Sequence, residues 1–368
     1  GWRIPFLLSV VLLVLSVYIR LKLRESPMFL AMKASGKGSR TPIRDSFCRW
    51  DNAQIVLRVL FGATAGQGVV WYAGQFYALY FLTTTCKVHY TDAYWLIAIA
   101  LVLGTPCFVL CGWLSDRIGR KKLILSGFLL AATTYFPIFR GLTEAANPTL
   151  ARTMRDQPVT MHTGEKQNGV ELVFAAVADA ASRIVMPPKV AKSELELARS
   201  HLNRRSVPFT LAPGRPGAPL VLDIGGTDVA SGYDAAKFDA VLDAAGYDTI
   251  TVLLPDGTTR AADPAAIDRL RIVLLLTLLV IYVTMVYGPI AAYLVELFPT
   301  RIRYTSMSLP YHIGNGWFGG FLPLIAASIV VFTGDIYAGL WYPIGIALLS
   351  LVTGLLLLDE QHERELDH

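Results

Sequence analysis

The chain has 368 residues, of which 54% are hydrophobic and only 17% are charged, and its mean hydropathy is +0.47. A soluble protein carries roughly 25% charged residues, so this composition argues against a soluble cytosolic enzyme. The net charge of +5 is unevenly divided. Residues 143–268 hold 12 Lys/Arg and 16 Asp/Glu, whereas the rest of the chain holds 21 and 12. An acidic segment, called the polar block from here on, therefore interrupts a hydrophobic and basic protein.

Seven stretches are apolar enough, or nearly so, to cross a membrane, which takes about 20 residues. The first, Ile4–Ile19, is short and is followed by basic residues. The other six are expected near Ile55–Thr83, Tyr94–Leu114, Leu123–Arg140, Ile272–Leu297, Ser306–Phe332 and Ile336–Leu358. Several contain Gly and Pro, which membrane helices tolerate because neighbouring helices satisfy the backbone.

The distribution of Lys and Arg in the short loops predicts the topology, because the cytoplasmic side carries the positive excess. The loop after the first span is strongly basic, and alternation puts residues 117–122 and 301–303 on the same side. We therefore expect the C-terminal tail in the cytoplasm and the polar block on the outer side of a bacterial inner membrane. The first span then runs inward, and the chain begins with Gly1. We expect a C-terminal portion of a longer protein.

The polar block is predicted to be a small α/β unit between four spans (residues 1–142) and three spans with a tail (residues 269–368). Residues 193–204 and 234–245 have apolar side chains at helical spacing, and Thr249–Leu254 followed by PDGT indicates a strand and a turn. Residues 205–219 are rich in Pro and Gly and predict a loop.

The string LDIGGT at residues 222–227 is similar to a phosphate loop of sugar kinases. The polar block is too small for that fold, so a strand ending in a glycine turn explains the string. The four cysteines are too few and too scattered for a disulfide framework, and the spacing of the histidines and carboxylates predicts neither a metal site nor a catalytic one.

The sharpest local pattern is GWLSDRIGRKK, which begins at Gly112 and lies on a cytoplasmic turn between two spans. Glycine permits a tight turn, and Asp116 can cap the next helix or pair with an arginine. This segment resembles the signature loop of the major facilitator superfamily. Segments 66–82 and 295–323 are similar to the metabolite:proton symporter family within it, whose members carry osmolytes, dicarboxylates, tricarboxylates or shikimate.

The resemblance implies a partial major-facilitator fold, an α-helical membrane protein with about seven transmembrane helices, here helices six to twelve of twelve. It also implies that the acidic residue and the arginines of the loop latch helices in one state of the transport cycle. Glu296, before FPTRIR, is interpreted as part of a gating salt-bridge cluster and otherwise as a charged helix end. The gating candidates are Gly112, Asp116, Arg117, Gly119, Arg120, Glu296, Arg301 and Arg303.

Polar and aromatic residues in the spans are candidates for substrate binding. Gln67, Trp71, Gln75 and, less closely, Tyr72 share a helical face. Amides and aromatic rings can hold a carboxylate or a betaine, although polar residues in spans also serve helix packing. Further candidates in later spans are Tyr287, Asn315 and Trp317, and His312 is a weak candidate for proton coupling.

The sequence thus predicts a secondary active transporter, coupled to protons, for an organic acid, a dicarboxylate or a betaine- or proline-like osmolyte. The expected partners are the substrate, protons, lipid and the missing N-terminal helices, with neither nucleic acid nor a cofactor beyond the proton gradient. No Asp or Glu lies deep in a predicted span, so the coupling carboxylates are expected in those missing helices. The alternative is a non-transporting receptor whose polar block binds the ligand.

Overall fold

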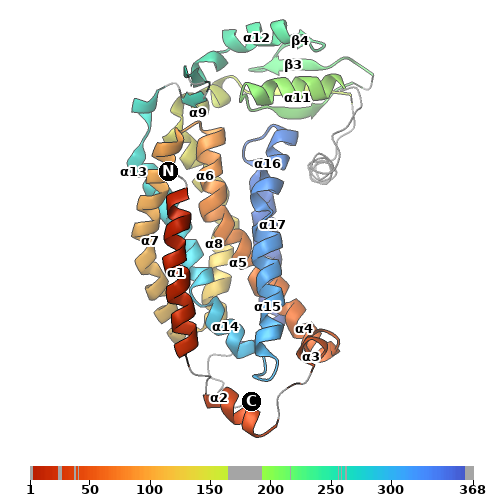
Figure 1. Ribbon diagram of the computed structural model, residues 1–368. Coiled ribbons are helices and arrows are strands. Elements are labelled where there is room, and N and C mark those ends of the chain that lie inside the picture. Colours follow the sequence, from red (N-terminus) through yellow and green to blue (C-terminus); the bar gives the residue numbers. More distant parts are fainter. Residues whose placement is uncertain are drawn as a thin grey trace.

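The computed structural model shows a bundle of long helices with the polar block at one end of it (Figure 1). The described residues are 3–23, 27–36, 39, 41–164, 193–215, 217–255, 257, 259–261 and 263–360. The predicted tail beyond residue 360, a large part of the polar block and two residues of the PDGT turn lie outside these ranges.

Six helices in the described part of the chain are long and apolar enough to cross a membrane. They are Trp50–Thr85, Tyr90–Ile118, Arg120–Ala146, Arg269–Leu297, Arg303–Thr333 and Ala338–Leu357. Each corresponds to one predicted span, and most are longer than predicted because polar residues at the ends continue the helix.

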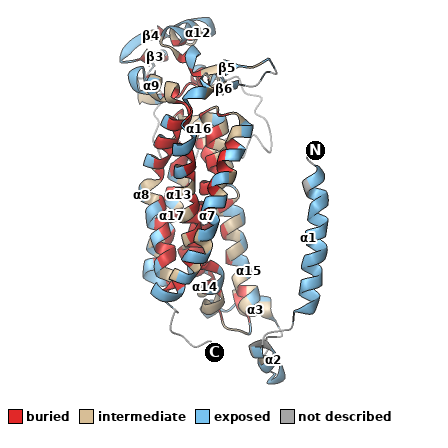
Figure 2. Cartoon of the chain, turned by 90° about the vertical axis from the view of Figure 1, so that its left-hand side faces the viewer, coloured by how far each residue is buried: buried red, intermediate tan, exposed pale blue. Residues whose placement is uncertain are grey.

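The seventh predicted span corresponds to α1 (Arg3–Lys22), which the structure places apart from the bundle (Figure 2). Its large apolar side chains are 47 to 81% exposed. Two short helices, α2 (Pro27–Ala34) and α3 (Pro42–Phe47), connect α1 to the bundle. The count of six among the described residues is thus one below the prediction, and α1 remains a predicted span.

Several of the six spans are interrupted by other helical turns. The first consists of α4 (Trp50–Val59), η1 (Leu60–Thr64), α5 (Ala65–Tyr72), η2 (Ala73–Tyr77), α6 (Ala78–Tyr80) and η3 (Phe81–Thr85), of which η1, η2 and η3 are π-helical. The next two are α7 (Tyr90–Ile118) and α8 (Arg120–Ala146). The last three contain α13 (Arg269–Tyr287) with α14 (Ile290–Leu297), α15 (Arg303–Ile313) with π-helical η6 (Gly314–Gly319) and α16 (Leu322–Thr333), and η7 (Ala338–Leu340) with α17 (Trp341–Leu357).

Glycines allow these helices to approach closely. A Cβ on Gly68 of α5 would lie 2.2 Å from the Gly314 carbonyl oxygen of η6, and one on Gly104 of α7 would lie 2.3 Å from Val280 of α13. Small residues at such contacts are the usual means of packing membrane helices. Gly68, one of the glycines expected in the spans, thus serves the contact between α5 and η6.

The polar block contains a four-stranded sheet of order β2-β1-β3-β4. The strands are β1 (Val159–Thr163), β2 (Thr210–Pro213), β3 (Val221–Ile224) and β4 (Thr227–Ser231). β1 pairs with β2 in parallel and with β3 antiparallel, and β3 pairs with β4 antiparallel. The small α/β prediction is confirmed in this part of the chain.

Among the described residues of the polar block, three helices accompany the sheet: α9 (Pro148–Asp156), α11 (Glu194–Arg204) and α12 (Ala235–Ala244). Both predicted helices are confirmed. Ser193 and Glu196 form a reciprocal capping box at the start of α11, and Asp234 accepts a hydrogen bond from the Lys237 backbone at the start of α12. The helices bury Leu202 and Phe238 together with Met161 of the sheet.

The prediction of a loop over residues 205–219 is wrong in part, because β2 forms there. Thr210 and Leu211 of β2 pair with Thr160 and Met161 of β1. This pairing joins segments 50 residues apart, so it cannot be predicted from the composition of either segment alone. The glycine turn is confirmed: Gly225 and Gly226 have φ values of +64° and +86°, and they connect β3 to β4.

The polar block contacts the end of the bundle at two places. At the first, the Phe209 amide donates a hydrogen bond of 3.1 Å to the Gly334 carbonyl, and the Arg199 guanidinium lies 4.2 Å from the centre of the Phe332 ring. At the second, the Ala261 amide donates a hydrogen bond of 2.8 Å to the carbonyl of Lys87.

Asn147 reinforces the second contact. Its side-chain nitrogen is within 3.3 Å of the Cys86 carbonyl and within 3.1 Å of the Ile250 carbonyl. Here η4 (Tyr247–Ile250) leads into a hairpin of β5 (Thr251–Leu253) and β6 (Thr259–Ala261), which is followed by η5 (Pro264–Ala266).

Candidate functional site

Gln67 and Asn315 are hydrogen-bonded to each other in both directions. The Gln67 side-chain nitrogen donates to Asn315 Oδ1 at 3.0 Å, and Asn315 Nδ2 donates to Gln67 Oε1 at 3.1 Å. Gln67 lies on α5 and is fully buried, while Asn315 lies on η6 and is half-buried. The pair therefore joins two predicted site residues at the close crossing of these helices.

An aromatic group lies beside this amide pair. The ring centres of Trp71 and Tyr287 are 4.4 Å apart, and the hydroxyl of Tyr287 is 3.2 Å from that of Tyr311. The Tyr311 carbonyl in turn accepts a hydrogen bond of 2.9 Å from Asn315. Residues from α5, α13, α15 and η6 thus form one continuous polar and aromatic cluster, which we call the amide–aromatic cluster.

The remaining predicted substrate residues have different positions. Tyr72 stacks on Phe76, with ring centres 5.1 Å apart, and Gln75 is half-buried in η2. Trp317 is 67% exposed and makes no described contact with the amide–aromatic cluster. His312 is also exposed, and its Nδ1 lies 2.7 Å from the Ser308 carbonyl, so that Nδ1 carries the hydrogen.

The π-helical turns lie next to this cluster. η2 follows Trp71 and contains Gln75, and η6 contains Asn315. A π-helical turn changes the direction of side chains along a helix and is frequent at functional sites. The sequence does not predict these turns, because glycines at residues 62, 68 and 314 are compatible with straight helices as well.

Arg120, at the start of α8, brings together two of the other predicted gating residues, Asp116 and Glu296. One terminal nitrogen of Arg120 lies 3.0 Å from Asp116 Oδ1, and the other contacts Glu296 of α14. The side chains of Arg120 and Glu296 are only 17% and 15% exposed, whereas that of Asp116 is 63% exposed. The loop between α7 and α8 is therefore tied by ion pairs to the end of α14.

Two glycines of the predicted motif have unlike surroundings. Gly119 has a φ of +103°, and a Cβ there would lie 2.5 Å from a Glu360 carboxylate oxygen. Gly112 has no described neighbour within 4 Å of such a Cβ. Of these two glycines, Gly119 and not Gly112 therefore forms the tight turn predicted for this loop.

The other predicted arginines do not join the ion pairs of Arg120. Arg117 lies over the Trp113 ring, 4.0 Å from its centre. Arg303 donates a hydrogen bond of 3.0 Å to the Phe298 carbonyl, and Arg301 is exposed. Within the described residues, neither Arg301 nor Arg303 forms an ion pair with Glu296.

Two residues near these sites were missed by the sequence analysis. Tyr311 lies one helical turn before Asn315, a spacing that could have indicated a shared face. Lys121 follows Arg120, and its amino group donates to the carbonyls of Leu355 and Leu358 at the end of α17. The dipole of a helix attracts a lysine to its C-terminus. Lys121 therefore also holds the end of α17 against the start of α8.

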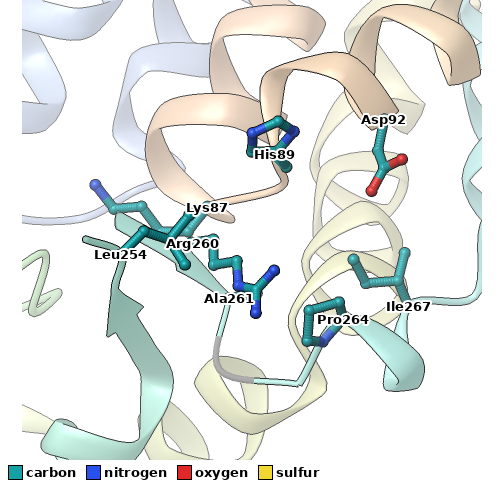
Figure 3. A pocket seen from close by; sticks show the side chains of 8 residues that line it. All are labelled: Lys87, His89, Asp92, Leu254, Arg260, Ala261, Pro264 and Ile267. Atoms are coloured by element: carbon teal, nitrogen blue, oxygen red, sulfur yellow. The ribbon is translucent and has the colours of Figure 1, made fainter. Parts of the chain in front are cut away.

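A pocket of about 180 Å³ lies where the β5–β6 hairpin meets the loop before α7 (Figure 3). It is lined by Lys87, His89, Asp92, Leu254, Arg260, Ala261, Pro264 and Ile267. Burial lowers the pKa of the Lys87 amine. None of these residues could be predicted as functional from the sequence, because they come from two segments that are far apart in the chain.

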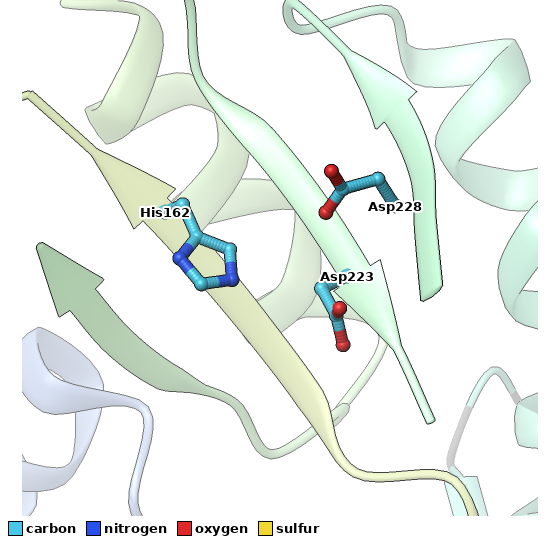
Figure 4. Close-up of side chains that lie close together, drawn as sticks. All are labelled: His162, Asp223 and Asp228. Atoms are coloured by element: carbon cyan, nitrogen blue, oxygen red, sulfur yellow. The ribbon is translucent and has the colours of Figure 1, made fainter. Parts of the chain in front are cut away.

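Three potential metal ligands lie together on the sheet of the polar block: His162, Asp223 and Asp228 (Figure 4). Their ligand atoms are all within 4.8 Å of one another. Asp223 accepts a hydrogen bond of 2.9 Å from the Gly226 amide, and Asp228 is exposed. Asp223 thus has a structural role in the glycine turn.

A partly exposed network of ion pairs and hydrogen bonds supports the polar block. Asp239 lies 2.7 Å from Arg205 Nη1 and 2.9 Å from His201 Nε2, and the Tyr233 hydroxyl is 3.3 Å from His201 Nδ1. Burial would raise the pKa of Asp239, but the hydrogen bonds from Arg205 and His201 outweigh burial and hold this pKa below its usual value.

Comparison with known proteins agrees with this arrangement. Residues 1–144 match the sequence model of the Major Facilitator Superfamily. The chain is similar to the Escherichia coli K12 protein YdfJ, with 34% identity over 124 residues, which are 33% of this chain and 28% of YdfJ. No solved structure matches it.

Two relatives from the same strain have names that state a substrate. The alpha-ketoglutarate permease is 31% identical over 148 residues, which are 40% of this chain and 33% of the permease. The shikimate transporter is 28% identical over 148 residues, which are 39% of this chain and 32% of the transporter. The matched segments therefore span about a third or less of the length of each relative.

The family match covers residues 1–144 of the 368-residue chain and shows that this part is similar to the Major Facilitator Superfamily. With six helices among the described residues that are long and apolar enough to cross a membrane, the chain is a multi-pass membrane protein. The relatives above are named as transporters or as a permease.

Proposed function

We propose that the protein containing this chain is a proton-coupled secondary transporter of a small organic acid or a zwitterionic osmolyte, working by alternating access. The observation that carries the proposal is the amide–aromatic cluster, which gathers Gln67, Trp71, Tyr287 and Asn315 from three helices. The names of two relatives, a permease for alpha-ketoglutarate and a transporter of shikimate, support a carboxylate as substrate.

The amide–aromatic cluster has the chemistry for such a substrate. Amide nitrogens donate hydrogen bonds to a carboxylate, and aromatic faces attract a cationic group. Transporters of this kind bind their substrates near the middle of the membrane between two halves. In this proposal Trp71, Gln75 and Tyr287 contact the substrate, while the bond between Gln67 and Asn315 holds α5 and η6 in place.

The ion pairs of Arg120 provide the gate in this proposal. They join the loop before α8 to the end of α14, and breaking them frees these ends to separate. We place this end of the bundle in the cytoplasm because of its basic loops, and the polar block on the outer side.

Uptake into vesicles that contain the full-length protein tests the proposal. We expect labelled alpha-ketoglutarate, shikimate or betaine to accumulate when a pH gradient is imposed, and accumulation to stop when the gradient is dissipated. The proposal of a transporter would be rejected if all three compounds accumulated only to the level found in protein-free vesicles, with and without the gradient. Accumulation independent of the gradient would reject proton coupling alone.

The substrate site has a separate test. Gln75→Ala should raise the apparent Michaelis constant for uptake of the substrate. The amount of inserted protein should stay unchanged, because Gln75 is half-buried and has no described hydrogen-bond partner whose loss would weaken the packing of the helices. Trp317→Ala is the control, since Trp317 is mostly exposed and has no contact with the substrate in this proposal. An unchanged constant for Gln75→Ala would exclude it from the site.

A further inference from the structure

The pocket beside Arg260 is formed by residues of the polar block and of the helix bundle. Leu254 and Arg260 come from the β5–β6 hairpin of the polar block, and Lys87, His89 and Asp92 come from the loop and first turn of α7. The hydrogen bond between the Ala261 amide and the Lys87 carbonyl fixes the two parts against each other. The Lys87 backbone has a φ of +59°, which is uncommon for a residue with a side chain.

Positive charge predominates in this pocket. Figure 3 shows the Arg260 guanidinium between the Lys87 amine on one side and the Asp92 carboxylate on the other. Asp92 is itself 3.9 Å from Arg269. In the described part of the chain, no carboxylate lies within ion-pair distance of Arg260 or Lys87. The pocket therefore has two cationic side chains in its lining, Lys87 and Arg260, against one carboxylate, Asp92, which has Arg269 outside the lining as its partner.

Arg260 also has an unused hydrogen-bond donor. Its Nε is buried and has no hydrogen-bond partner among the described residues. A buried donor without a partner costs free energy, and a guanidinium keeps its charge at any pH that a protein meets. Both the donor and the charge are satisfied by a planar carboxylate, which an arginine can bind through two parallel hydrogen bonds.

The rest of the pocket suits a small molecule with a short hydrocarbon part. Leu254, Pro264 and Ile267 form an apolar wall. The volume of about 180 Å³ is below that of pockets for drug-sized ligands, roughly 300 Å³ and above. We propose that this pocket binds a small organic carboxylate through Arg260, at a site separate from the amide–aromatic cluster.

A labelling experiment on the full-length protein in nanodiscs of neutral lipid tests this site, with succinate as the probe. Leu254→Cys places a thiol in the pocket wall, and its reaction with a thiol-specific reagent is followed by mass spectrometry of the peptide that contains residue 254. Thr259→Cys is the control, because Thr259 is exposed on the same hairpin and does not line the pocket. We expect millimolar succinate to slow labelling several-fold at residue 254 and not at residue 259.

Arg260 is tested in the Leu254→Cys background. Arg260→Gln should abolish the protection by succinate, Arg260→Lys should retain part of it, and Arg215→Gln, at an exposed position outside the pocket, should leave it intact. The thermal unfolding temperature of each variant shows whether the variant is folded. Should Arg260→Gln fail to fold, the Arg260→Lys variant decides: protection as strong as in the parent would overturn the role of the guanidinium.

Three other outcomes overturn the proposal. The first is labelling at residue 254 that succinate does not change. The second is protection that persists fully in a folded Arg260→Gln variant. The third is equal protection by inorganic phosphate or by nanodiscs containing phosphatidylglycerol, which would make the site one for phosphate or for a lipid headgroup. Labelling requires no transport, so its result does not depend on uptake by the amide–aromatic cluster.

Discussion

Arg120 and Glu296 form an ion pair between two cytoplasm-facing elements of the proposed topology, the start of α8 and the end of α14. Both side chains are largely shielded from solvent, whereas the second partner of Arg120, Asp116, is mostly exposed. We therefore expect the two carboxylates to contribute unequally: Glu296 to stability and to the proposed gate, and Asp116 to the proposed gate with little effect on stability.

Substitution of each carboxylate separates these contributions. Glu296→Gln should destabilise the full-length protein by about 1–3 kcal/mol, because a shielded Arg120 loses a charged partner. Asp116→Asn should cost less than about 0.5 kcal/mol, as for an exposed pair one helical turn apart. Both should lower the initial rate of uptake. Thermal unfolding and uptake measure the two effects, and wild-type uptake by Asp116→Asn would disprove its gating role.

The glycines of the same loop should respond differently to alanine. Gly119→Ala places a side chain at a positive φ and against the Glu360 carboxylate, so we expect a loss of both stability and uptake. Gly112→Ala enters open space within a helix and should leave both nearly unchanged. The matched pair is compared by thermal unfolding and uptake. An equal loss in both variants would contradict this distinction.

The hydrogen bonds between Gln67 and Asn315 should be measurable as a coupling energy. In a double-mutant cycle of Gln67→Ala and Asn315→Ala, we expect a coupling of about 0.6 to 1.7 kcal/mol, the range found for polar pairs between membrane helices. Reversible unfolding of the full-length protein in detergent gives the four free energies. A coupling near zero would mean that the two amides do not hold α5 to η6.

The network around Asp239 should make the stability of the polar block depend on pH. The pKa of Asp239 is lowered in the folded state, so its contribution to stability is present above the usual pKa of about 4 and is lost as the pH falls through the lowered value. Asp239→Asn should lower the unfolding temperature at pH 6 and have a smaller effect at pH 3. Asp248→Asn, at an exposed position, is the control. An effect of Asp239→Asn that is the same at both pH values would contradict the role of the ionised carboxylate.

The sequence predicted local structure well where the signal is local. The six spans of the bundle follow from apolar length, and α11 follows from the capping residues Ser193 and Glu196. It did not predict β2, whose strand is defined by pairing with β1 across a long stretch of chain.

The candidate sites show the same limit. The shared face of Gln67 and Trp71 is a property of one helix and could be read from spacing, but the bond from Gln67 to Asn315 depends on how two distant helices cross. Likewise, Arg120 and Glu296 were each predicted as gating residues, while their contact depends on the packing of α8 and α14. The pocket of Arg260 arises only where two separate segments meet.

The polar block touches the bundle at Cys86 and Lys87 and again at residues 331–334. Both contacts are with the ends of helices that belong to one and the same bundle. If that bundle rocks as a unit during transport, the polar block moves together with it as one rigid body. An antibody bound to the polar block, which lies outside the membrane in the proposed topology, would then report the motion of the helices.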